Sequence, residues 1–390
     1  MLPSQQLAQF VADSKQLEAL CRELGRRGAT VHLKELVGGA LSFYAAAAIA
    51  RCGGLHIFVA EDRDAAAYLL NDFYNLLDEE RVCFFPSSWK RSAVYGAEDA
   101  QGVVQRTATM NALRSFSGAG YLVVCTYPEA LAERIVDAEA LNRGTIAVRV
   151  GDRISIEVLE QELVDAAFTR VDFVYEPGQY SVRGGIVDIF PMGAEAPLRL
   201  DLFDDEIDAI RSFDPDSQRS TGNVDRVRIL PGHEFAFDEE SRNRFRAAWR
   251  AAFPGDPNKC PVYVDVGSGI CSPGIEYYLP LFFESTGTLA DYLPDNALFI
   301  TLGETRDAID AFMRQTQERY KFLSHDAQRP ALAPEKLFDK ADDFFDAIAP
   351  FGRISLKAPE TGIDTPLTIE RSAKDPAAKL KDFIAKCRIE

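Results

Sequence analysis

The 390-residue sequence predicts an α/β protein in which a split, parallel-sheet domain is interrupted by an inserted α+β domain with an antiparallel sheet. Three observations support this class. Short apolar runs alternate with helical patterns up to about residue 134, and strands with turn signals dominate from about residue 145. The α/β alternation then returns after about residue 214. Apolar strands alternating with helices are typical of a parallel sheet covered on both faces.

The first segment, residues 1–134, begins with a helical pattern within 1–28 that places Leu17, Leu20, Cys21 and Leu24 on one face. A strand end is expected at 32–37. Further predicted helices are 41–51, 63–77 and 101–115, and further predicted strands are 55–60, 82–85 and 121–126. The inserted segment, 135–213, contains the run TIAVRV, a helix at 155–167, and short strands separated by PG, GG and DD turn signals. The DDE run at 204–206 is interpreted as a turn.

The third segment, 214–357, starts at the polar stretch DPDSQRSTGN. We expect helices at 239–253, 305–323 and 335–348 and strands at 261–266 and 297–302, with Thr305 as an N-cap and Asp307 in the first turn. The loop GSGICSPG (267–274) could hold an anion on its amides, but no Lys or Arg lies close in sequence, so a plain loop is favoured. Residues 358–390 are expected to form a linker and the start of a following domain, which suggests a piece of a longer protein.

Net charge, the spacing of cysteines and histidines, and the length of apolar runs argue against several classes of function. The formal net charge of −17 repels nucleic acid on average, although a local basic patch could still bind it. The seven cysteines show no CxxC spacing and the four histidines no HxxxH spacing, so we expect no metal site. No apolar run reaches the length of a membrane span, and the N-terminus does not resemble a secretory signal. We therefore expect a cytoplasmic protein without a membrane partner.

The stretch KELVGGALSFYAAAAIA (34–50) has the outline of a phosphate-binding loop. Such a loop requires GxxxxGK[ST], in which lysine neutralises phosphate charge and the hydroxyl holds Mg²⁺. Only the hydroxyl position is preserved here, so we interpret Gly38 and Gly39 as a strand-to-helix turn and predict no catalytic residues. The positions of the first glycine, second glycine, lysine and hydroxyl are taken by Glu35, Ala40, Leu41 and Ser42.

The most distinctive stretch is 170–213. Period-2 alternation places Val171, Phe173 and Tyr175 on one face together with Tyr180 and Val182, and places Arg170, Asp172, Ser181 and Arg183 on the other. A two-residue PG turn would pair these strands and bring Arg170 and Arg183 onto one surface. Phe190 shares the parity of Asp188, which predicts a polar, exposed position. Two interpretations remain open: an arginine-rich protein interface, or surface arginines paired with Asp172, Asp188 or Asp201, which spacing alone favours.

The runs YEPGQYSVRGGIVDIFP (175–191) and LRLDLFDDEIDAIRSFDPDSQRS (198–220) resemble the bacterial transcription-repair coupling factors, in the N-terminal region that is similar to the repair protein UvrB. The likeness continues through LPGHEF (230–235) and SPGIEYYLPLFF (272–283) and covers about residues 30–357. It implies that the inserted domain binds UvrA. Arg170 and Arg183 match the family's UvrA-contacting arginines, and a further UvrB arginine falls at Ser181; we add Phe190 to the expected surface.

The resemblance also implies a role for the whole protein: recruitment of UvrA to stalled RNA polymerase at DNA lesions. The family's ATP- and magnesium-dependent DNA translocase and its polymerase-binding domain would lie beyond residue 390, as would a C-terminal domain that covers the inserted domain. Unlike UvrB, this chain lacks an intact phosphate loop and a tyrosine-rich strand-separating hairpin. We therefore expect no cofactor in this chain. The alternatives are a diverged ATP-dependent DNA-processing lobe that uses Ser42, or a weak DNA-binding module.

Overall fold

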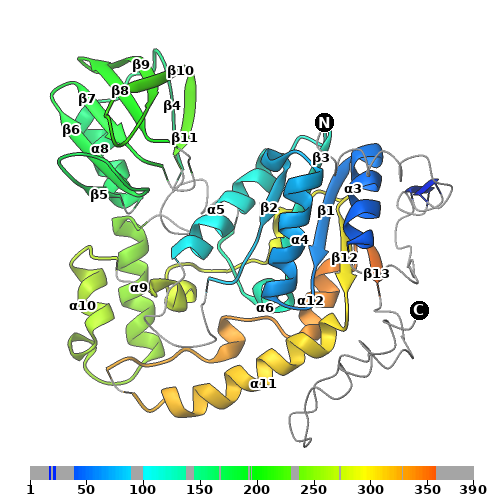
Figure 1. Ribbon diagram of the computed structural model, residues 1–390. Coiled ribbons are helices and arrows are strands. Elements are labelled where there is room, and N and C mark those ends of the chain that lie inside the picture. Colours follow the sequence, from blue (N-terminus) through cyan, green and yellow to red (C-terminus); the bar gives the residue numbers. More distant parts are fainter. Residues whose placement is uncertain are drawn as a thin grey trace, which may run out of the picture.

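The computed structural model describes residues 17–18, 21–22, 39–88, 100–137, 145–166, 168–191, 194, 196–229, 237–271, 274–326 and 328–356. Figure 1 shows two units, a parallel-sheet body and a smaller, mainly antiparallel module. The module is formed by the middle of the sequence, and the body by the segments before and after it. The predicted combination of a split α/β domain with an inserted α+β domain is compatible with this arrangement.

The body is built on a five-stranded parallel sheet with the order β13-β12-β1-β3-β2. Its strands are short and apolar, and Ile57, Val59, Val123 and Val124 are fully buried, as the sequence predicted for strands covered on both faces. These strands are β1 (Gly54–Val59), β2 (Val82–Phe84), β3 (Tyr121–Thr126), β12 (Leu298–Leu302) and β13 (Gly352–Leu356).

Helices connect these strands at bounds close to the predicted ones. The Asp62 side chain caps α4 by accepting a 2.8 Å hydrogen bond from the Ala65 amide, which fixes where that helix begins. The helices of the body's first part are α3 (Ala40–Cys52), α4 (Arg63–Leu76), the 3₁₀ turn η1 (Glu79–Arg81), α5 (Ala100–Ser115) and α6 (Pro128–Ala132). Those that follow the module are α9 (Glu239–Ala252), η2 (Pro257–Lys259), α10 (Pro261–Gly267), η3 (Ile275–Leu281), η4 (Leu289–Tyr292), α11 (Thr305–Leu323), η5 (Pro334–Lys336) and α12 (Ala341–Ile348).

The strand predicted at 261–266 is wrong, because this segment forms helix α10. Pro261 occupies the first turn, where its missing N–H costs nothing. Val262, Tyr263 and Val266 are buried against α9, at the spacing of a helix, and Val264 is exposed. A short apolar run of this kind cannot be assigned by periodicity alone. The aromatic cluster of Phe245, Trp249, Tyr263 and Phe282 on α9, α10 and the segment after η3 selects the helix.

The C-terminal part of the body departs from prediction at three points. Thr305 is the first residue of α11 and not its N-cap, which is Glu304, and no side chain makes a capping hydrogen bond there. Asp307 does lie in the first turn. The helix predicted at 335–348 is divided into η5 and α12, and β13 adds an unpredicted strand beside β12.

The module contains a six-stranded sheet with the order β10-β9-β8-β7-β6-β5, a two-stranded sheet of β4 and β11, and helix α8. The Ser155 hydroxyl caps α8 by accepting a hydrogen bond from the Val158 amide. The expected boundary near residue 214 falls between β9 and β10, which pair with each other, so strand pairing continues to Ile229. The elements are β4 (Ile146–Arg149), α8 (Ile156–Asp165), β5 (Thr169–Arg170), β6 (Gln179–Arg183), β7 (Ile186–Ile189), β8 (Leu198–Phe203), β9 (Glu206–Phe213), β10 (Ser220–Val224) and β11 (Arg226–Ile229).

Near the N-terminus, Leu17 and Cys21 pack against α3 at Tyr44, Ala47 and Ala48, in agreement with the predicted apolar face. Leu20, Leu24, the strand end at 32–37 and the segment 358–390 lie outside the described residues. Within the described part of the chain, no helix has both the length and the apolar character to cross a membrane.

Candidate protein-interaction site

The two faces of the six-stranded sheet have opposite characters. Tyr180, Val187 and Ile189 point to one face and share a core with Leu159 and Leu163 of α8. Burial there raises the pKa of Tyr180 to about 12. The strand register places a second set of side chains on the other face, which we call the outer face: Ser181, Arg183, Asp188, Phe190, Arg199, Asp201 and Arg211.

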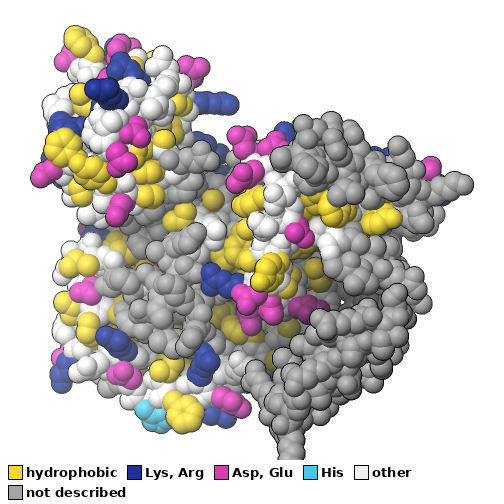
Figure 2. All heavy atoms as spheres, viewed as in Figure 1, with side chains coloured by type: hydrophobic (Ala, Val, Ile, Leu, Met, Phe, Trp, Pro, Cys, Tyr) yellow, Lys and Arg dark blue, Asp and Glu magenta, His cyan; other side chains and the backbone are white. Residues whose placement is uncertain are grey.

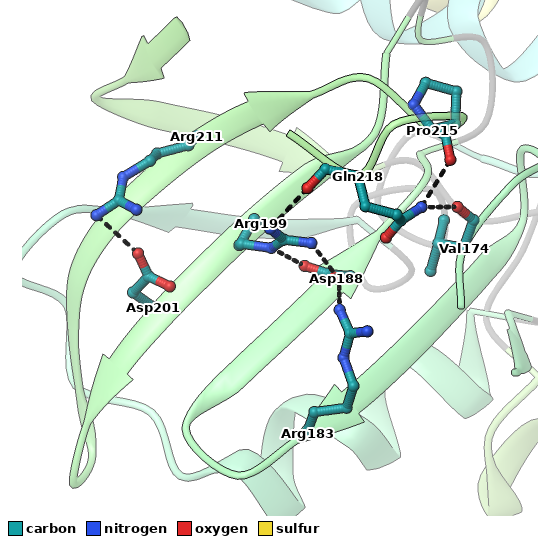
Figure 3. A network of polar contacts seen from close by, with 8 residues as sticks. All are labelled: Val174, Arg183, Asp188, Arg199, Asp201, Arg211, Pro215 and Gln218. Carbon is teal, nitrogen blue, oxygen red and sulfur yellow. Dashed lines mark hydrogen bonds and ion pairs between the residues drawn. The ribbon is translucent and has the colours of Figure 1, made fainter. Parts of the chain in front are cut away.

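The outer face is organised by one buried carboxylate (Figure 3). Asp188 is fully buried and accepts two hydrogen bonds from Arg199, of 2.7 Å and 2.9 Å, as well as one from Arg183. The hydrogen bonds to Asp188 raise the pKa of Arg199 above its ordinary value. Arg199 also donates to the Gln218 carbonyl at 3.2 Å. A buried charged network of this kind is favourable only when each charge has a partner, and Asp188 is the partner of both guanidinium groups.

The segment after β5 crosses one end of the outer face. β5 pairs parallel to β6, so the predicted hairpin across the PG turn is wrong. Gln218 donates through Nε2 to the Val174 carbonyl at 3.2 Å and thereby holds the crossing segment, and Val174 packs with Phe190 and Phe213. Phe190 is therefore only 7% exposed, and its predicted exposed position is also wrong.

The crossing segment leaves two aromatic rings at the surface. Phe173 is 47% exposed and Tyr175 is 55% exposed. The Arg183 guanidinium lies over the Phe173 ring, with 4.8 Å between Cζ and the ring centroid. Arg183, Phe173 and Tyr175 form what we call the Arg183 patch. In Figure 2, basic, acidic and hydrophobic side chains are interspersed over the visible face of the module, without one broad charged area.

The structure does not bring the predicted site residues together on one face. Arg170 pairs at 2.6 Å with Glu160 of α8, the residue to which the Tyr180 hydroxyl also donates. It thus belongs to the α8 side, whereas Arg183, with 37% of its side chain exposed, belongs to the outer face. Ser181 is only 1% exposed. The error came from assuming an antiparallel neighbour for the 170–175 segment. The exposure of Phe173 and Tyr175 follows from the crossing, which no local pattern encodes.

In the segment that resembles a phosphate-binding loop, the Ser42 hydroxyl makes a contact within the fold. Ser42 is buried in α3 and donates a 2.5 Å hydrogen bond to Oδ2 of Asp72 in α4. Leu41 packs against the core of the body, and Gly39 precedes the helix as its N-cap. Ala40 opens α3. Glu35 and Gly38 lie outside the described residues. In the described part, the hydroxyl thus joins α3 to α4, and the position expected for lysine contributes to the core of the body.

Comparison with known proteins agrees with this architecture. Residues 146–235 match the family model of the UvrB interaction domain. This range contains every strand of the module. The chain is therefore one that carries a UvrB interaction domain beside an α/β body.

Most of the chain is similar to transcription-repair-coupling factors. It is 32% identical to that of Haemophilus influenzae, over 82% of this chain and 29% of the relative. It is also 32% identical to that of Escherichia coli, over 83% and 28%, and 28% identical to that of Bacillus subtilis, over 75% and 26%. The chain belongs to the transcription-repair-coupling factor family, as its sequence motifs suggested, and resembles the N-terminal region. It spans less than a third of the length of these relatives.

Proposed function

We propose that this chain is a non-catalytic module that recruits UvrA in transcription-coupled repair, with the Arg183 patch as the main contact. The observation that carries the proposal is the match of residues 146–235 to the UvrB interaction domain, within a chain related to transcription-repair-coupling factors. RNA polymerase, DNA and a covering C-terminal domain would act through regions beyond this chain. ATP and magnesium would bind there too.

The chemistry of the Arg183 patch supports a protein contact. Asp188 and the Phe173 ring hold the Arg183 guanidinium between them, so little side-chain entropy remains to be lost on binding. Arginine and tyrosine are enriched among the residues that dominate binding energy at interfaces. The exposed Phe173 ring beside the held guanidinium supplies apolar area, and the guanidinium supplies directional donors.

The decisive experiment measures the affinity of UvrA for this chain by calorimetry or interferometry. We expect Arg183→Ala to weaken binding by about 30-fold, which corresponds to about 2 kcal/mol for a hot-spot residue. The variant should remain folded because Arg199 still pairs with Asp188. Arg149→Ala is the matched control, since Arg149 makes an ion pair of 2.8 Å with Asp152 on the separate β4–β11 sheet. Equal affinities for the two variants would refute the site, and no binding by the wild type would refute the function.

The contacts of α3 support the non-catalytic part of the proposal. A magnesium-binding hydroxyl must be free to face the nucleotide, whereas Ser42 donates to Asp72, and Leu41 offers no charge to a phosphate. We expect calorimetric titration with ATP and Mg²⁺ to give no binding at micromolar concentrations. Micromolar binding that Ser42→Ala abolishes would instead favour a nucleotide-dependent DNA-processing lobe.

A further inference from the structure

Helix α9 carries four arginines, and three of them recur at every fourth residue: Arg242, Arg246 and Arg250. We call these three the arginine row. Positions four apart lie on one face of a helix and are about 6 Å apart along its axis. The row flanks the buried stripe of Phe245 and Trp249. Helix α10 lies beside α9 (Figure 1), and Arg246 and Arg250 contact its residue Tyr263.

Aromatic rings support each guanidinium of the row. Arg242 lies over Phe237, with 5.9 Å between Cζ and the ring centroid. Arg246 and Arg250 lie over the ring of Tyr263, at 5.7 Å and 5.8 Å. A guanidinium held against an aromatic face keeps its edge N–H groups available to an acceptor, and its planar fork matches phosphate oxygens.

The row lacks carboxylate partners among the described residues, although the chain as a whole is strongly acidic. The fourth arginine of α9 shows the contrast, because Arg244 pairs with Glu240 at 3.6 Å and with Glu284 at 2.7 Å. Arg246 Nε is buried and has no hydrogen-bond acceptor in the described structure. The three guanidinium groups of the row therefore form a local positive stripe.

The glycine loop after α10 lies directly against the arginine row. Gly269 has a φ of +78°, and a Cβ added there would lie 2.6 Å from Nη1 of Arg242. The sequence offered this loop no basic neighbour, but the fold brings Arg242 and Arg246 beside it. The amides of Ser268, Gly269 and Ile270 already bond to carbonyls of α10. An anion here would therefore be held by guanidinium groups and not by backbone amides.

We propose that the arginine row binds the sugar–phosphate backbone of a single nucleic-acid strand, without preference for base sequence. Nε of Arg242 donates to the Asp238 carbonyl at 3.3 Å, but no carboxylate pairs with the row among the described residues. An evenly spaced row of such planar cations suits a polymer with evenly repeated anions. The acidic remainder of the chain confines the contact to this stripe, so at most about three phosphates are neutralised. The row lies outside residues 146–235, the range that matches the UvrB interaction domain.

The test is the binding of a fluorescent oligothymidylate to the 390-residue chain, followed by anisotropy over a series of salt concentrations. Three neutralised phosphates on a single strand predict a slope of about −2 for the logarithm of the association constant against the logarithm of salt concentration. A tenfold increase in salt should thus weaken binding about 100-fold. The triple variant Arg242→Gln, Arg246→Gln, Arg250→Gln should lose this dependence, and each single variant should flatten the slope by about 0.7.

Arg244→Gln is the matched control, because it removes the same charge from the same helix at a carboxylate-paired position. It should bind like the wild type, and circular dichroism should confirm that all variants keep their helix content. Three outcomes would overturn the proposal. One is that the wild type does not bind the oligonucleotide at low salt, and another is that the Arg244 variant loses as much affinity as the row variants. The third is that polyglutamate at the same charge concentration displaces the oligonucleotide. The last result would identify an acidic protein segment as the ligand instead.

Discussion

Removing the carboxylate of Asp188 should loosen the module more than any change to a surface ion pair. Asp188 is fully buried and pairs with Arg199, whose side chain is 16% exposed, and with Arg183. Asp188→Asn keeps the size of the side chain but leaves Arg199 without a counter-charge. Loss of one partner of a buried pair costs about 3–5 kcal/mol. We expect a value near 3 kcal/mol because Arg183 can turn toward water.

Hydrogen exchange of the β6, β7 and β8 amides measures this effect where it occurs. Trp249 lies in α9 and Trp89 precedes every module strand in the sequence, so tryptophan fluorescence would not report on these strands directly. If exchange proceeds through opening of the module, a cost of about 3 kcal/mol accelerates it about 150-fold. The measurement therefore needs no assumption that module and body unfold together.

Asp201→Asn provides the comparison on the same sheet face. Asp201 pairs with Arg211 at 2.9 Å, but both side chains are partly exposed. Its loss should cost no more than about 1 kcal/mol, or about fivefold in exchange rate. If Asp188→Asn accelerated exchange no more than Asp201→Asn does, the idea that Asp188 organises the outer face would be refuted.

Three further predictions concern the body. Glu133→Ala should lower the free energy of unfolding, measured in urea, by about 3–5 kcal/mol, because it removes the carboxylate that lies 3.4 Å from Nη1 of the fully buried Arg106. A loss below about 1 kcal/mol would contradict this expectation. Gly53→Ala should lower the melting temperature, because Gly53 has a φ of +63° and a new Cβ would lie 2.7 Å from the Gly120 carbonyl oxygen. An unchanged melting temperature would argue against strain at this position. Burial lowers the pKa of His56 below 6.5, so the unfolded chain takes up a proton at a higher pH than the folded chain does. The free energy of unfolding should therefore fall as pH drops below about 6.5, by up to about 1.4 kcal/mol per pH unit. His56→Gln should flatten this plot of stability against pH, and parallel plots for the two proteins would exclude the effect.

Local sequence pattern was sufficient for much of the body. The bounds of β3 and α11 agree with the predicted 121–126 and 305–323, because β3 is almost entirely apolar and α11 is long and amphipathic. The turn at Asp204 and Asp205 between β8 and β9 was also predictable, since Asp tolerates the positive φ of 53° found at Asp204. In each case the interactions that define the element lie within a few residues of one another.

The candidate site depended on contacts that are distant in sequence. Strand direction and register brought Arg199 and Arg183 to Asp188, and the crossing of the 171–175 segment buried Phe190. The sequence alone determined the family motifs and the loss of the phosphate-loop lysine at Leu41. The tertiary structure decided which arginines are paired, which are free and which aromatic rings reach the surface. Pairing and burial depend on which segments pack together, and a local pattern does not specify that choice.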